Sequence, residues 1–91
     1  MNSSSESVVV NIGGIEYSIR TDIDIELTLK IAKYVDQKMM EMKNNNSIRD
    51  DVKISVLTAL NIAGELFEYK SKLEKVQQKL VKIQDKISNF T

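Results

Sequence analysis

The side chains that most resemble a reactive site are three acids near the start of the chain, Asp22, Asp24 and Glu26. Grouped carboxylates can act in acid–base catalysis or hold a metal ion, but both uses need further ligands or a basic partner. The chain has no His and no Cys, so it lacks the usual activators of Ser and Thr hydroxyls and the usual zinc ligands. The acids also suit the first turn of a helix. We therefore expect no enzyme activity, no catalytic residues, no cofactor and no metal site.

Basic residues gather in the last quarter of the chain. Residues 70–91 hold 6 basic and 2 acidic residues, residues 1–69 hold 7 basic and 11 acidic residues, and the whole chain is neutral. Lysines clustered on a helix can bind nucleic acid phosphates or a membrane surface. The solvated exterior of a helix has the same composition, and lysines without Arg or interleaved aromatic residues recognise bases poorly. We favour the solvated exterior and do not expect nucleic acid as the partner.

Two strands are expected to open the fold. Val8, Val10 and Ile12 share one face, with Ser7, Val9 and Asn11 on the other, and Ile15, Tyr17 and Ile19 alternate with polar residues, which is the period of a strand. Gly13 and Gly14 lie between the two runs and can adopt the positive φ angles of a two-residue hairpin turn. The pattern predicts an antiparallel β-hairpin, preceded by a flexible segment over residues 1–7.

A helix is predicted after the hairpin. Thr21, Asp22 and Asp24 can each cap its start, and apolar residues recur at steps of three and four through about residue 43. The run Asn44-Asn45-Asn46-Ser47 favours a short loop, and Asp50 or Asp51 can cap a second helix.

The second helix is predicted to run from about residue 50 to the last residue. Its length of nearly 40 residues, close to 60 Å, exceeds what so small a chain can bury. From about residue 66 apolar residues occupy every a and d position of a heptad pattern, which is typical of a coiled coil. The a and d positions are Leu66, Tyr69, Leu73, Val76, Leu80, Ile83, Ile87 and Phe90.

The heptad pattern predicts a homo-oligomer, because about 50 further residues cannot cover both the hairpin and this helix. Leu at three a positions with β-branched Val76 and Ile83 at two of the four d positions favours four chains over two. The fold class is therefore α+β: a ββα head over residues 8–49, followed by a long coiled-coil helix over residues 50–91. No stretch is apolar enough to suggest a membrane span or a signal peptide, so we expect a cytoplasmic protein.

The stretch Thr58-Ala59-Leu60-Asn61-Ile62-Ala63-Gly64-Glu65-Leu66 resembles the signature of the bacterial cell-division family ZapA. Two further blocks agree with it: Gly14-Ile15-Glu16-Tyr17-Ser18-Ile19, and Val35-Asp36-Gln37-Lys38-Met39. The resemblance covers about residues 8–67, and the rest of the chain matches in its heptad pattern.

The resemblance implies dimers joined by parallel helices and two such dimers joined antiparallel, with heads at both ends. It also implies that the heads bind the tubulin-like division protein FtsZ and that the assembly bundles FtsZ filaments at the division site. Two other readings remain open: an oligomeric adaptor whose basic helix binds nucleic acid or another scaffold, and a subunit of an unrelated complex.

The resemblance places FtsZ contacts on charged residues around the hairpin and the loop between the helices. Lys43 falls on a position that is basic in some members. Ile15, Ser18 and Ser47 stand where certain members carry basic residues, so the nearest basic residues are taken as substitutes by proximity. The candidate partner-binding residues are Lys43, Arg49, Arg20, Lys38 and Lys53.

Overall fold

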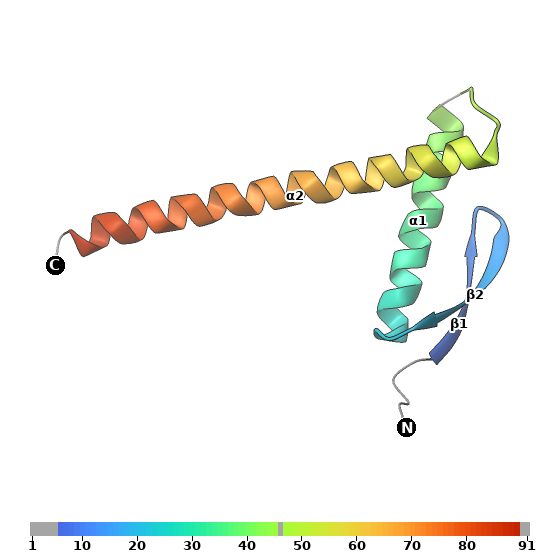
Figure 1. Cartoon of the computed structure of the whole chain (residues 1–91), viewed down its shortest axis with the longest axis horizontal. Coiled ribbons are helices and arrows are strands. Elements are labelled where there is room, and N and C mark those ends of the chain that lie inside the picture. The colour runs from blue at the N-terminus through green and yellow to red at the C-terminus, as the bar shows by residue number, and fades with distance from the viewer. Residues whose placement is uncertain (1–5, 46, 90–91) are drawn as a thin grey trace. The chain divides into compact units, whose positions relative to one another are not determined.

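A computed structural model describes residues 6–45 and 47–89 of the chain. Two strands are followed by two helices (Figure 1): β1 spans Glu6–Ile12, β2 spans Ile15–Thr21, α1 spans Ile25–Asn45 and α2 spans Asp51–Ser88. This is the predicted α+β arrangement of a hairpin, a shorter helix and a long helix.

The hairpin forms in the predicted register. β1 and β2 pair antiparallel with Ile12 opposite Ile15, and Gly13 and Gly14 have φ angles of 64° and 82°. Positive φ at both central residues is the geometry of a type I′ turn, which Gly adopts without steric cost. β1 begins two residues before the predicted start at Val8, because Glu6 pairs with Thr21 and Ser7 pairs with Arg20. Residues 1–5 of the predicted flexible segment lie outside the described residues.

The start of α1 is fixed by side chains on both sides of its first turn. Of the three predicted caps, Asp24 serves, because its Oδ2 accepts a hydrogen bond from the Leu27 N–H at 3.2 Å. Thr21 instead accepts the Ile23 N–H at 3.1 Å and forms a buried hydrogen bond to the Thr28 hydroxyl at 2.9 Å. Thr21 therefore ties the end of β2 to α1.

The core of the head joins three elements. Among the described residues the buried apolar side chains are Val10 on β1, Ala32 on α1 and Ile54 on α2, with exposed fractions of 4%, 7% and 0%. α1 packs against β1 (Figure 1), which covers the Val10 side of the hairpin. So small a core leaves many large apolar side chains in the head exposed.

The second helix begins at Asp51, directly after its cap. Asp50 Oδ1 accepts hydrogen bonds from the N–H groups of Val52 and Lys53 at 2.8 and 3.1 Å. The chain divides into two compact units, Met1–Ala59 and Leu60–Thr91. The first unit therefore ends ten residues later than the predicted head, because Ile54 and Thr58 of α2 are buried in it. No helix among the described residues has the length and apolar character needed to cross a membrane.

Candidate partner-binding surface

Lys43 lies in the last turn of α1, where three hollows of the head meet. The first has a volume of about 260 Å³ and lies beside the hairpin turn, lined by Gly13, Gly14, Asp36, Met39, Met40 and Lys43. The second has a volume of about 180 Å³ and is lined by Lys43, Ile48, Arg49, Asp51 and Ile54. Lys43 thus borders both the hairpin turn and the loop between the helices.

The structure brings together two of the five predicted cations. Lys43 and Arg49 line the same hollow, Lys43 from the end of α1 and Arg49 from the loop that leads to α2. A pair of cations beside apolar side chains can hold a partner segment that combines acidic and apolar residues. Among the described residues, this pair is the part of the predicted surface with the best-defined geometry.

The remaining predicted cations do not line the hollow shared by Lys43 and Arg49. Lys38 forms an ion pair with Glu41 at 3.8 Å, and its Nζ lies 5.4 Å from the centre of the Tyr34 ring. Lys53 belongs to the first turn of α2, and Arg20 lies on β2 opposite Ser7.

A contact that the sequence did not reveal holds the hairpin turn against α1. The Gly13 N–H donates a hydrogen bond of 2.8 Å to Asp36 Oδ1. A Cβ built on Gly13 would lie 3.0 Å from Met39 Cε, so the turn fits closely over that side chain. Nothing in the sequence distinguishes Asp36 from an acid that faces solvent. Asp36 and Met39 shape the hollow beside Lys43.

The heptad residues of α2 form the second candidate surface. Seven of the eight predicted residues are described, and their exposed fractions lie between 51% for Leu66 and 66% for Tyr69. The eighth, Phe90, lies outside the described residues. We call this row the seam: Leu66, Tyr69, Leu73, Val76, Leu80, Ile83 and Ile87. Within the chain the seam is uncovered, which is the condition a coiled coil needs before it meets its partners.

Two lysines lie over aromatic rings near the start of the seam. Lys72 Nζ is 5.5 Å from the centre of the Tyr69 ring, and Lys70 Nζ is 5.3 Å from the centre of the Phe67 ring. These two lysines therefore already interact with aromatic rings of their own helix.

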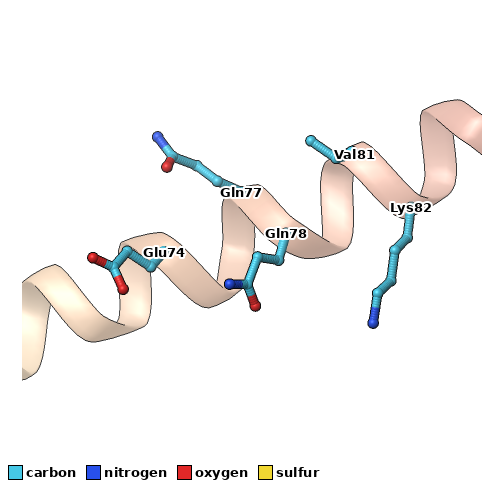
Figure 2. Close-up of a pocket in the computed structure, with 5 residues that line it drawn as sticks. All are labelled: Glu74, Gln77, Gln78, Val81 and Lys82. Atoms are coloured by element: carbon cyan, nitrogen blue, oxygen red, sulfur yellow. The ribbon is translucent and has the colours of Figure 1, made fainter.

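A further hollow, of about 400 Å³, lies along α2. Figure 2 shows that its lining comes from this helix alone: Glu74, Gln77, Gln78, Val81 and Lys82. Since all five lining residues belong to one helix, the hollow is a shallow depression on the surface of that helix. Within the described residues no three acids lie close enough together to hold a metal ion.

Comparison with known proteins shows which family shares this architecture. A family model described as "Cell division protein ZapA" matches residues 8–91. The cell division protein ZapA of Shouchella clausii is 34% identical over 73 residues, which cover 80% of this chain and 94% of that protein. The protein of the same name from Geobacillus thermodenitrificans is 38% identical over 74 residues, covering 80% of each chain.

Two solved structures share the fold of this chain. A ZapA mutant dimer from Geobacillus stearothermophilus superimposes with a TM-score of 0.67 at 30% identity, covering 84% of this chain and 88% of that one. A conserved bacterial protein of unknown role from Pseudomonas aeruginosa PAO1 shares the fold, with a TM-score of 0.67 at 23% identity over 93% of this chain and 99% of that one.

Proposed function

Because this chain belongs to the ZapA family of cell division proteins, we propose that it binds FtsZ through its heads and cross-links FtsZ filaments. The observation that carries the proposal is the uncovered seam of α2, whose described residues are all more than half exposed. A single chain cannot hide this surface, so copies of the chain join along it. The proposed place of action is the cytoplasm at the division site, and the proposed role needs no chemistry.

The proposed assembly is a tetramer built from two dimers. Parallel helices join two chains, and two such pairs meet antiparallel, so that heads stand at both ends. The Leu residues at a and the β-branched residues at two of the four d positions favour four chains. Lys72, Lys79 and Lys86 occupy the g positions, which leaves their charge available to acidic residues of a second pair of chains.

The proposed mechanism is bivalent binding across a stiff spacer. Once one head holds a filament, the opposite head meets the next filament at a high effective concentration, so weak contacts add up without a new interaction. α2 supplies the spacer, since 38 residues of continuous helix span about 57 Å at 1.5 Å per residue. Filaments held at a fixed spacing would align into bundles.

The proposed FtsZ contact centres on Lys43 and Arg49. These cations line one hollow at the end of α1, next to the apolar side chains Ile48 and Ile54. Replacing both cations by Glu reverses the charge of the site, and like charges across an interface oppose binding. The test is co-pelleting of the full chain with FtsZ and GTP at physiological salt. Lys43→Glu with Arg49→Glu should raise the FtsZ concentration needed for half-maximal pelleting at least about tenfold, because two charged contacts at about 1 kcal/mol each are lost.

The matched control is Lys75→Glu with Lys82→Glu, which makes the same change in net charge on the outer side of the coiled coil. Light scattering on both double variants checks that each stays assembled. If the head variant keeps its assembly and pellets like the wild type, the proposed contact is wrong. If the coil variant alone loses FtsZ binding, the FtsZ contact lies on the basic helix and not on the head.

A further inference from the structure

The proposed function leaves the outer edge of β2, on the head, without a role. We propose that the β2 strands of two copies of this chain pair antiparallel about Ser18, which joins their two-stranded hairpins into one four-stranded sheet. This surface is separate from the seam of α2 and from the hollow shared by Lys43 and Arg49.

The hairpin register decides which residues of β2 face outward. A type I′ turn closes with a hydrogen-bonded pair, here Ile12 and Ile15, and such pairs recur at every second residue. Ile15, Tyr17 and Ile19 therefore direct their backbone groups toward β1. Their neighbours direct theirs to the open edge: Glu16, Ser18 and Arg20. Among the described residues β2 pairs with β1 alone, so these outward groups have no strand partner.

The charges on this edge of one copy are complementary to those on the same edge of a second, antiparallel copy. Glu16 and Arg20 lie four residues apart, about 13 Å along a strand, which is too far for an ion pair within one chain. Their partners on β1 are the neutral Asn11 and Ser7. When two β2 strands run antiparallel about Ser18, Glu16 of each copy lies opposite Arg20 of the other. Each such position exchanges backbone hydrogen bonds as well as opposite charges.

The other side of β2 gains apolar contact from the same pairing. Ile15, Tyr17 and Ile19 are 55%, 44% and 37% exposed, whereas Val10 on the neighbouring strand is 4% exposed beneath α1. The proposed register places Tyr17 opposite Ile19 of the second copy. An aromatic residue opposite a β-branched residue is a favourable cross-strand pair. The apolar face of the hairpin would thus continue across both copies.

Alternative registers and the other edge fit less well. A shift of one residue sets the apolar side of one strand against the polar side of the other, and a shift of two residues separates Glu16 from Arg20 of the second copy. The edge of β1 presents Ser7, Val9 and Asn11, which carry no charge to align it. β2 is also seven residues long, contains no Pro and pairs without a bulge, so three of the usual features that block edge pairing are absent from it, and its two edge charges have opposite signs.

A single cysteine tests the register directly, because the chain has no cysteine of its own. In the proposed sheet the two Ser18 Cα atoms lie about 5.5 Å apart, within the range of a disulfide. The matched control is Val9→Cys, since Val9 lies opposite Ser18 on β1. The two Val9 residues would lie three strand spacings apart, about 14 Å, which is beyond the reach of a disulfide.

We expect Ser18→Cys in the full chain to form covalent dimers under mild oxidation, at least about tenfold faster than Val9→Cys. Equal rates for the two variants, or no covalent dimer from either, would overturn the proposal. Because FtsZ is absent from this assay, its failure leaves the proposed filament binding untouched.

Charge exchange provides the second test, in the Ser18→Cys background. Glu16→Arg alone and Arg20→Glu alone each place like charges opposite one another twice, so each should slow the covalent dimer about tenfold. The double exchange restores opposite charges and should restore the rate. A mixture of the two single variants should yield the mixed dimer in preference to either homodimer. If the double exchange stays as slow as the single changes although circular dichroism shows it folded, the assigned register is wrong.

Discussion

At the scale of single residues, the best-defined contact of the head is the hydrogen bond from the Gly13 N–H to Asp36 Oδ1, at 2.8 Å. It joins the tip of the hairpin to the middle of α1, residues 23 positions apart in the chain. Met39 lies directly beneath the same glycine. The position of the hairpin turn, and with it the hollow beside Lys43, therefore depends on one carboxylate.

Asp36→Ala should lower the free energy of unfolding by about 1–2 kcal/mol, because it removes a hydrogen bond to a charged acceptor and leaves the Gly13 N–H without its partner. Urea unfolding followed by circular dichroism, at equal protein concentrations, measures the change. Asp22→Ala is the control. It removes the same charge from an exposed residue that lies three positions before the start of α1. Equal stability of the two variants would show that the Asp36 contact does not hold the turn.

Asp36 also shows where the sequence was insufficient at this scale. The glycine pair predicted the turn because only backbone freedom was needed, and both φ angles are positive as expected. The partner of the turn could not be predicted, because an Asp on a helix has the same local pattern whether it faces water or a distant N–H. The choice of Asp24 over Asp22 as the cap was open for a similar reason, since both precede the helix.

At the scale of elements, the seam could be proposed from the sequence alone because it depends on repetition along one helix. The heptad pattern needs no knowledge of any other segment, and each of its described residues lies half exposed along α2. The hollow shared by Lys43 and Arg49 could not be predicted in this way. It forms only where the end of α1, the loop and the start of α2 meet. Resemblance selected Lys43 and proximity added four further cations, of which the structure places only Arg49 in the same hollow.

Placing charges in the seam should dissociate the assembly. In Leu73→Glu with Leu80→Glu, two a positions in each helix become acidic and would have to be buried without partners. Multi-angle light scattering should show a mass close to that of one or two chains in place of four.

The control for the seam places the same two charges on the opposite side of the helix, with Ser71→Glu and Gln78→Glu. Both positions are exposed and lie outside the heptad row, so the mass should match the wild type. A seam variant that keeps the mass of four chains would mean that the a and d positions are assigned wrongly.

At the scale of the whole molecule, binding and bundling of filaments should separate. Leu73→Glu with Leu80→Glu leaves Lys43 and Arg49 unchanged, so single heads should still bind FtsZ while losing the gain from bivalency. High-speed sedimentation collects all filaments and measures binding, whereas low-speed sedimentation collects only bundles. We expect the variant to pellet with filaments at high speed and to form no bundles at low speed. Bundles at the wild-type level would exclude a spacer built on the seam.

The order of elements could be predicted from the sequence, but the division into compact units could not. Alternation, glycines and heptads each mark one element, so the hairpin and both helices were found. The unit boundary lies inside α2, after Ala59, because Ile54 and Thr58 are buried in the head. A continuous helical pattern gives no signal at such a boundary, since the helix itself does not stop there.

The half-exposed seam also ties the stability of α2 to the amount of protein present. A helix whose apolar side is covered only by other copies gains free energy from association, and this gain grows with the logarithm of chain concentration. Dilution should therefore melt the second half of α2 before the head, whose core residues Val10, Ala32 and Ile54 belong to one chain.

If each bridge takes four chains, the number of bridges rises more steeply than the number of chains. Under the proposed function, a modest change in synthesis of the protein would then be amplified into a larger change in the number of filament bridges.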